Sequence, residues 1–138
     1  MSALLQARPG DILPARRHRV DQALIDAYAV VSGDHNPLHT DAAFAATTHF
    51  GRTIAHGMMT LAFVSAAMEA WAGPGWAERG VVDVTFLSPV HPGDEVSVTA
   101  EVGEPGAAQA ACRVTCTVAE RQVMVGQVSI LPASGTPA

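Results

Sequence analysis

The feature that most restricts the fold is an apolar segment in the middle of the chain, from Met58 to Trp71. Its sequence, M-M-T-L-A-F-V-S-A-A-M-E-A-W, has apolar side chains at almost every position. A surface helix keeps a polar face, whereas a helix that is apolar all round is buried. The sequence therefore predicts a buried helix over 58–71, which ends at Gly73-Pro74-Gly75 because glycine and proline interrupt helices.

The residues after position 81 follow a different pattern, because their apolar side chains recur at every second position. This period is typical of strands, and turn-forming residues at 89–94, 103–106 and 120–121 divide the region into four of them. The predicted strands are V-V-D-V-T-F-L (81–87), V-S-V-T-A-E-V (96–102), A-C-R-V-T-C-T-V (111–118) and Q-V-M-V-G-Q-V-S-I (122–130).

An antiparallel meander of these strands, wrapped around the buried helix, satisfies both patterns at once. This arrangement is the hot-dog architecture, an α+β fold. We expect a single domain over residues 1–138, with its core at about 10–131 and loose ends at 1–10 and 133–138. One small sheet does not cover such a helix on every side, so we also expect a homodimer or a higher assembly of dimers.

The N-terminal half is predicted to supply a short strand and two helices. Alternating and adjoining arginines indicate a solvated strand near 16–19. A helix begins after Asp21, whose side chain suits an N-cap, and ends at Gly33. A loop is expected over 34–40, because an Asn-Pro pair prevents a continuous helix, and a short helix over 41–46.

Composition and charge disfavour several classes of function. The net charge is −5, and of the eight basic residues only the three arginines at 16–19 lie close together, so we expect no nucleic-acid partner. No apolar run is long enough for a membrane span and no signal peptide is recognisable, which predicts a cytoplasmic protein without membrane association. Cys112 and Cys116 would lie about 13 Å apart in one strand, too far for a disulfide, and are interpreted as buried core thiols.

The densest group of reactive side chains lies in S-G-D-H-N-P-L-H-T-D, residues 32–41. Its carboxylate and histidine, Asp34 and His39, suit general acid–base catalysis on one bound water. The alternative is an exposed turn in which Asp34 and Asn36 bond to their own backbone, and the residues alone favour neither. We expect no metal, because the proline between His35 and His39 prevents the two imidazoles from sharing a helix face.

A second candidate is Gly57, in I-A-H-G-M-M (54–59), where a loop leads into the buried helix. A backbone N–H at the start of a helix lacks an intrahelical partner, and the helix dipole helps it to receive an oxygen that becomes negative. The alternative is that Gly57 only permits tight packing or caps the helix. The spacing does not separate these two interpretations.

The segment Y-A-V-V-S-G-D-H-N-P-L-H-T-D-A-A-F-A (28–45) resembles the signature of the MaoC-like, (R)-specific enoyl-CoA hydratases, also called hydratase 2. The resemblance continues through A-H-G-M-M (55–59) and F-L-S-P-V-H-P-G-D-E-V (86–96), and covers roughly residues 10–131. It implies a single hot-dog enzyme that hydrates 2-enoyl thioesters, or dehydrates 3-hydroxyacyl thioesters in the reverse direction. The substrate would be carried on CoA or acyl carrier protein, with no other cofactor.

The resemblance also implies roles for individual residues. Asp34 and His39 match the catalytic pair that activates water, and Asn36 matches the asparagine that shapes their loop. Gly57 matches the glycine whose N–H binds the thioester carbonyl, and His56, in the same motif, is expected to support the substrate site. The resemblance does not assign which of Asp34 and His39 is the base.

Several alternatives stay open from the sequence. Ser65 falls where related enzymes have a serine that supports the catalytic aspartate, and helix packing explains a small residue there almost equally well. A hot-dog thioesterase, or a non-catalytic subunit that binds acyl carriers, would share the fold. Arg52 is a candidate contact for a carrier phosphate, although surface arginines have many other uses. The sequence does not distinguish CoA from acyl carrier protein, or define acyl length.

Overall fold

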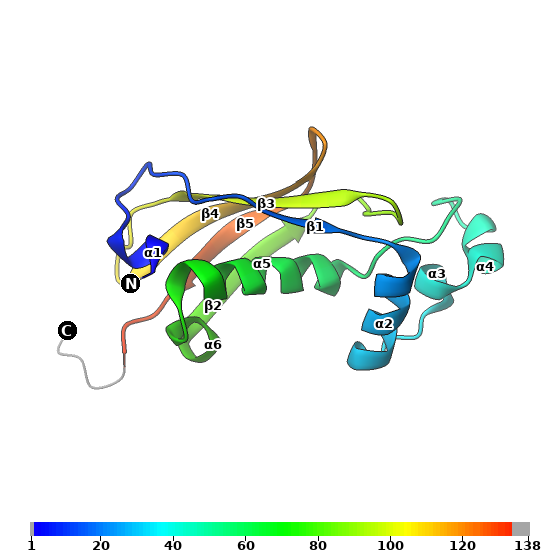
Figure 1. Ribbon diagram of the computed structural model, residues 1–138, viewed down its shortest axis with the longest axis horizontal. Helices are drawn as coiled ribbons and strands as arrows, with labels where there is room; N and C mark the ends of the chain where they lie inside the picture. The colour runs from blue at the N-terminus through cyan, green and yellow to red at the C-terminus, as the bar shows by residue number, and fades with distance from the viewer. Residues whose placement is uncertain (1, 134–138) are drawn as a thin grey trace.

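The computed structural model describes residues 2–133, which form one antiparallel sheet and several helices. The strands lie side by side in the order β1-β3-β4-β5-β2 and the longest helix, α5, runs along one face of the sheet (Figure 1). The predicted hot-dog fold is confirmed. In chain order the elements are α1 (Ala3–Gln6), β1 (Arg16–Arg19), α2 (Gln22–Ser32), α3 (Pro37–Thr40), α4 (Ala42–Ala46), α5 (Gly57–Ala72), α6 (Gly75–Arg79), β2 (Gly80–Phe86), β3 (Glu95–Val102), β4 (Ala110–Val118) and β5 (Arg121–Ile130).

The core lies between the sheet and α5. Alternate side chains of the interior strands β3 and β4 are buried, as the period of two requires. The thiol of Cys112 lies 3.9 Å from the sulfur of Met68 on α5, so sheet and helix meet directly. Cys112 and Cys116 are free and buried, which confirms their interpretation as core thiols; burial raises their pKa values to about 11 and about 12.

The predicted meander is wrong for its first strand. Strands β3, β4 and β5 follow one another as expected, but β2 pairs with β5 at the far edge, with Val82 opposite Val128. The segment between β2 and β3 (87–94) contains Pro89 and Pro92, and it is too long and too rich in proline for a tight hairpin. It therefore crosses from one edge of the sheet towards the other.

The N-terminal segment was predicted to be loose, but residues 2–13 pack and bond against the rest of the chain. Helix α1 buries Leu4, and the chain after it bonds to β3 through Gly10 N–H to Val102 O at 2.7 Å and Leu13 N–H to Ala100 O at 2.9 Å. Backbone bonding of this kind fixes a terminus that composition alone would leave free. The predicted loose C-terminal end at 133–138 lies, apart from Ala133, outside the described residues.

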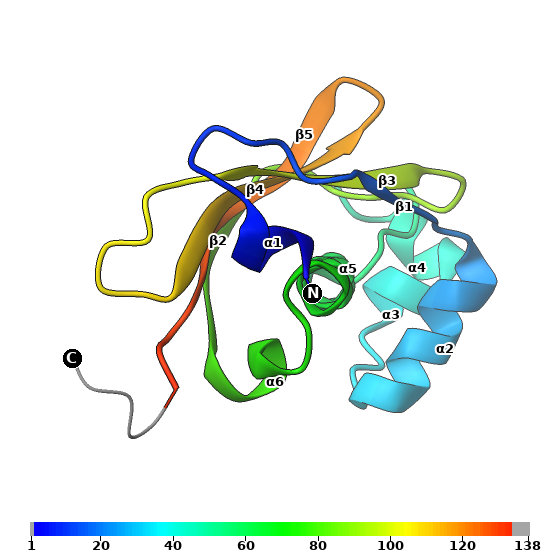
Figure 2. The same cartoon turned by 60° about the vertical axis from the view of Figure 1, so that its left-hand side comes forward.

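Helix α5 is buried on one side only within this chain, which corrects the prediction of burial all round. Figure 2 views α5 nearly end-on, with the sheet above it, α6 on one side, and α2, α3 and α4 on the other. The exposed stripe consists mainly of small or apolar side chains. Its residues are Met58, Ala62, Ser65, Ala66, Glu69 and Ala70.

Helices α2, α3 and α4 carry the candidate site. Asp21 caps α2 as predicted, accepting from Leu24 N–H at 2.8 Å, and the helix ends at Gly33 with a left-handed φ of 76°. The segment predicted as a loop contains α3, because Pro37 occupies its first turn, where no helical N–H bond is lost, and Asn36 caps it. None of the helices described here is long and apolar enough to span a membrane.

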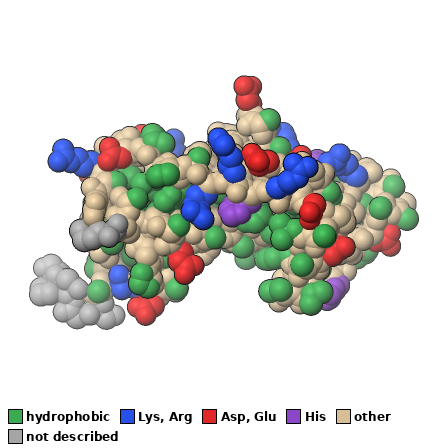
Figure 3. Space-filling view, viewed as in Figure 1, with side chains coloured by type: hydrophobic (Ala, Val, Ile, Leu, Met, Phe, Trp, Pro, Cys, Tyr) green, Lys and Arg blue, Asp and Glu red, His purple; other side chains and the backbone are tan. Residues whose placement is uncertain are grey.

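Charged side chains do not gather by sign on the face in Figure 3, where arginines are interspersed with carboxylates. The arginines of β1 follow this pattern, since Arg19 lies opposite Glu95 of β3. The strand predicted at 16–19 is confirmed as an edge strand.

Candidate active site

Asp34 and His39 lie together at the junction of α2 and α3. One carboxylate oxygen of Asp34, Oδ2, is 3.9 Å from Nε2 of His39. The other, Oδ1, accepts the backbone N–H of Asn36 at 3.1 Å, which fixes the carboxylate in a local turn. Asn36 itself accepts Leu38 N–H at 3.0 Å as the cap of α3. The sequence left two alternatives, a turn bonded to its own backbone and a close pair of Asp34 and His39. The structure contains both arrangements.

The protonation of His39 follows from its hydrogen bonds. Nδ1 lies 2.8 Å from the carbonyl oxygen of Ile54, and a carbonyl only accepts, so Nδ1 carries the proton. In the neutral ring Nε2 is then an acceptor that faces a second acceptor, the Asp34 carboxylate. A separation of 3.9 Å is too long for a direct hydrogen bond. A water that donates one proton to each atom satisfies both, and this is the geometry that activation of water requires.

His56 supports this pair from the buried side. Its Nε2 lies 3.0 Å from the backbone carbonyl of Asp34, so Nε2 carries the proton and holds the aspartate's backbone in place. The ring is stacked on that of His39, with centroids 3.9 Å apart, and lies near Tyr28. Nδ1 of His56 is buried and has no hydrogen-bond partner among residues 2–133.

Asp34, His39 and His56 each offer a ligand atom within 4.8 Å of the others, which is close enough to consider a metal ion. The orientation of the rings argues against one. A ligating lone pair lies in the plane of its imidazole ring, and the two rings are stacked with only 29° between their planes. One ion does not lie in both planes without turning a ring out of the stack. The group suits a bound water better than a metal ion.

Gly57 is the first residue of α5, and its φ is not in the left-handed region. His56 before it makes no side-chain cap, and the N–H of Gly57 has no hydrogen-bond partner in the described part of the chain. This N–H is therefore available to an oxygen of a ligand, with the helix dipole behind it. The absence of a cap argues for the functional interpretation over simple capping.

An apolar pocket of about 310 Å³ begins at Gly57. Neither Asp34 nor His39 lines it, so the pocket and the acid–base pair are separate features. The segment 54–57 joins them, because Ile54 lines the pocket while its carbonyl oxygen binds His39. The side chains around the pocket are mostly apolar and include Phe50, Thr60, Phe86, Pro89 and Val90.

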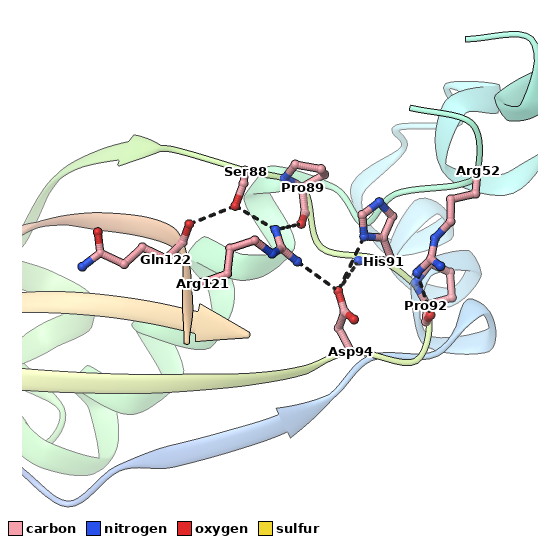
Figure 4. A network of polar contacts seen from close by, with 8 residues as sticks. All are labelled: Arg52, Ser88, Pro89, His91, Pro92, Asp94, Arg121 and Gln122. Carbon is pink, nitrogen blue, oxygen red and sulfur yellow. Dashed lines mark hydrogen bonds and ion pairs between the residues drawn. The ribbon is translucent and has the colours of Figure 1, made fainter. Parts of the chain in front are cut away.

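The rim of this pocket is held by the polar contacts in Figure 4. Arg121 donates to Ser88 Oγ at 2.8 Å and to the Pro89 carbonyl at 2.7 Å, and it pairs with Asp94 at 3.6 Å. Asp94 also lies 3.7 Å from His91. Burial, followed by the positive charge of Arg52, lowers the pKa of His91.

Arg52 differs from Arg121 in having no carboxylate partner among the residues that the structure describes. Its only hydrogen bond within residues 2–133 is a long one, 3.4 Å, to the carbonyl of Pro92, and the residue is exposed. It follows Phe50 of the pocket wall by two positions. Of these two arginines near the rim, Arg121 is therefore paired with a carboxylate, whereas Arg52 has only a carbonyl contact in the described chain.

The structure does not bring Ser65 to Asp34 within the chain. Ser65 lies two turns along α5 from Gly57, a rise of about 12 Å, and its hydroxyl accepts from the indole of Trp76 at 2.9 Å. The support that the resemblance implied for Asp34 comes here from Asn36 and His56. Sequence reasoning missed the Ile54 carbonyl and the side chains of Gln22 and Thr53, which contact the same region.

The sequence matches the family model for the MaoC-like domain over residues 5–124. The chain belongs to the MaoC-like family. Among its relatives, a 3-hydroxybutyryl-CoA dehydratase of Methylorubrum extorquens is 34% identical over 83% of this chain and 74% of its own length. An (R)-specific enoyl-CoA hydratase of Rhodospirillum rubrum is 36% identical, over 84% of this chain and 83% of its own. The solved R-hydratase of Pseudomonas aeruginosa superposes on this MaoC-like chain with a TM-score of 0.81 at 29% identity, covering 99% of this chain and 95% of its own.

Proposed function

We propose that this chain adds water across the double bond of 2-enoyl thioesters to give (R)-3-hydroxyacyl thioesters, and catalyses the reverse dehydration. The observation that carries the proposal is the pair of facing acceptors, Asp34 Oδ2 and His39 Nε2, held 3.9 Å apart. Each is oriented by a backbone bond that leaves the facing atom free. The names of the Rhodospirillum and Methylorubrum relatives describe the two directions of such a reaction.

The proposed reaction divides the chemistry among these two side chains and the Gly57 N–H. The thioester oxygen binds the Gly57 N–H, and the water held by Asp34 and His39 forms a bond to C3. The electrons of the double bond move into an enolate, whose negative charge the amide and the helix dipole stabilise. One proton of the water passes to the pair and a proton returns to C2, so the product contains all atoms of substrate and water. Because the water is fixed on one face, one stereoisomer forms.

The charge on the pocket rim supports a phosphate-bearing carrier. Arg52 lies beside an apolar pocket in a chain whose net charge is −5. We assign Arg52 to a phosphate of the carrier, because it has no carboxylate partner in the described chain and lies two residues from the pocket wall. CoA and acyl carrier protein both provide such a phosphate. The cytoplasmic location expected from the sequence stays a prediction.

We further propose that two copies pack together through the exposed stripe of α5. The small side chains of Ala62, Ala66 and Ala70 allow another helix to approach closely, and Met58 would otherwise remain 58% exposed.

A thioesterase is the second candidate, and the state of the two cysteines disfavours one that uses a thiolate nucleophile. Cys112 and Cys116 are buried with raised pKa values, so neither provides a thiolate nucleophile. Attack of the bound water on the thioester carbon would also place negative charge on the carbonyl oxygen. The reaction products therefore separate hydration from hydrolysis.

One assay separates the functions. The protein is mixed with crotonyl-CoA and a chelator, and the conjugated enoyl absorbance is followed together with release of free thiol. Loss of absorbance without thiol supports hydration without a metal. Thiol release would indicate hydrolysis, and neither signal a binding subunit. Activity that appears only when zinc replaces the chelator would overturn the metal-free proposal.

Variants then test the acid–base pair. We expect Asp34→Asn and His39→Ala each to lower hydration by about 100-fold or more, the usual size of such effects. His35→Ala is the matched control, since His35 is exposed in the same loop. A folded Asp34 or His39 variant with the rate of the His35 control would remove that residue from the mechanism.

A further inference from the structure

Gln22, the first residue of α2, makes three hydrogen bonds from its side-chain amide. Nε2 donates to the backbone carbonyl of His39 at 2.8 Å and to Asp26 at 2.9 Å, and Oε1 accepts the hydroxyl of Thr53 at 2.7 Å. The orientation of the amide is unambiguous, because the His39 carbonyl and the Asp26 carboxylate accept hydrogen bonds and do not donate them. Both N–H groups of the amide are therefore used.

These bonds join the two segments that orient the imidazole of His39. His39 belongs to α3, whereas the carbonyl that binds its Nδ1–H belongs to Ile54, in the segment before α5. Gln22 binds the backbone of His39 on one side and Thr53, the neighbour of Ile54, on the other. The contacts form a closed ring from Gln22 through Thr53, Ile54 and His39 back to Gln22.

Apart from the His39 Nδ1–H bond to Ile54 and the stacking of His39 on His56, one direct backbone bond joins the two segments in the described chain. The direct backbone bond from Ile54 N–H to Leu38 O is 3.4 Å long, at the limit of useful hydrogen-bond geometry. Thr53 is 6% exposed, so its hydroxyl would lose a partner in a dry environment if Gln22 were removed. The amide of Gln22 is therefore a stronger link between α3 and the segment that carries Ile54 than this backbone bond, and it supports the bond from His39 to Ile54.

We infer that Gln22 is a positioning residue, which fixes the distance between His39 and Ile54 and so keeps the Nδ1–H tautomer of His39. With that tautomer, Nε2 stays bare and faces Asp34. Without the link, the Nδ1–H bond lengthens and Nε2 gains a share of the ring proton, which leaves it unable to accept from water. The inference rests on the proposed hydration for its effect on rate, whereas the tautomer itself is measured without substrate.

The test uses Gln22→Met, which keeps the length of the side chain and removes all three bonds. We expect kcat for crotonyl-CoA to fall by about 10- to 100-fold with little change in KM, the range for removing a group that orients a reacting side chain. In ¹⁵N spectra of histidine-labelled protein, His39 should change from one tautomer to a mixture. Gln127→Met is the matched control, because Gln127 is exposed on β5.

Thr53→Val is the second variant, and it removes only the hydroxyl bond to Gln22 while keeping the shape of the side chain. It serves in place of Gln22→Met if that variant does not fold, and we expect the same two changes at smaller size. An unchanged tautomer overturns the inference, whether or not kcat falls, because the effect would not pass through His39. If the unmodified protein does not hydrate crotonyl-CoA, the proposed function fails while the tautomer experiment still decides the role of Gln22.

Discussion

Replacing Gly57 by proline removes a single N–H at a place where the backbone accepts proline. Gly57 is the first residue of α5, and proline is favoured there because this N–H has no helical partner. The preceding residue is suitable too, since His56 has φ −59° and ψ 135°, within the extended region that a following proline requires. The substitution therefore tests the hydrogen bond to the thioester oxygen with little cost to the helix.

The expected loss in kcat is about 100-fold, the lower range for one oxyanion donor, and it corresponds to about 2.7 kcal/mol of transition-state stabilisation. Alanine is the natural control because it keeps the N–H. The structure shows a complication: a Cβ at position 57 would lie 3.1 Å, 3.3 Å and 3.4 Å from three ring atoms of Phe86. Phe86 must move by a few tenths of an ångström for either substitution.

The comparison is therefore made in a Phe86→Leu background, which relieves the contact. We expect Gly57→Ala/Phe86→Leu to hydrate crotonyl-CoA at nearly the rate of Phe86→Leu alone, and Gly57→Pro/Phe86→Leu to be about 100-fold slower. Circular dichroism and thermal unfolding check that each variant is folded. Equal rates in the two double variants would refute the role of the Gly57 N–H, because only one of them retains it.

Three further predictions concern the carrier, the assembly and pH. Arg52→Ala should raise KM for crotonyl-CoA by about 10-fold and leave KM for the crotonyl thioester of N-acetylcysteamine, which lacks phosphate, unchanged. Arg113→Ala is the control. Equal effects of Arg52→Ala on the two KM values would contradict a phosphate contact. Sedimentation should show a dimer at micromolar concentration, and Ala66→Arg on α5 should give monomer. Burial, with a smaller contribution from Arg16, lowers the pKa of His18, which stacks on Phe63. Below about pH 6.5 the unfolded chain therefore binds more protons than the folded one, so the contribution of neutral His18 to the free energy of unfolding is present above that pH and is lost as the pH falls. The urea midpoint should fall between about pH 7.5 and pH 5.5, and His18→Phe should make this fall smaller.

The sequence predicted the elements better than their pairing. Periodicity placed the last three strands within one residue of their observed bounds, because alternation records which side chains face the core. It does not record which strand lies next to which. Strand β2 has the same alternation whether it pairs with β3 or β5, and only the proline-rich connection at 87–94 argued against a hairpin. The α3 helix was missed because Pro37 was interpreted as a helix breaker and not as the first residue of a helix.

The candidate site was predicted where its residues lie within one motif, and missed where a contact comes from a segment distant in the sequence, as for Gln22 and Thr53. Asp34 and His39 were found because an acidic residue and a histidine in one polar loop are visible in the sequence. The carbonyl of Ile54 determines which nitrogen of His39 carries its proton, and a carbonyl leaves no signal in the residue type. Ser65 was given two interpretations by the sequence, support of the catalytic aspartate or helix packing, and within the chain its hydroxyl contacts the indole of Trp76.

The placement of β2 at the far edge of the sheet has a consequence for how the chain folds. The contacts β3–β4 and β4–β5 join neighbouring segments, and their loops close at small entropic cost. The edge strands are different, because β1 must find β3, with Arg16 opposite Val98, across most of the chain. We expect the β3-β4-β5 unit to form early and to act as a template for both edges. The segment carrying Asp34 and His39 lies between β1 and α5 in the chain. We therefore expect the candidate site to form in the last stages of folding.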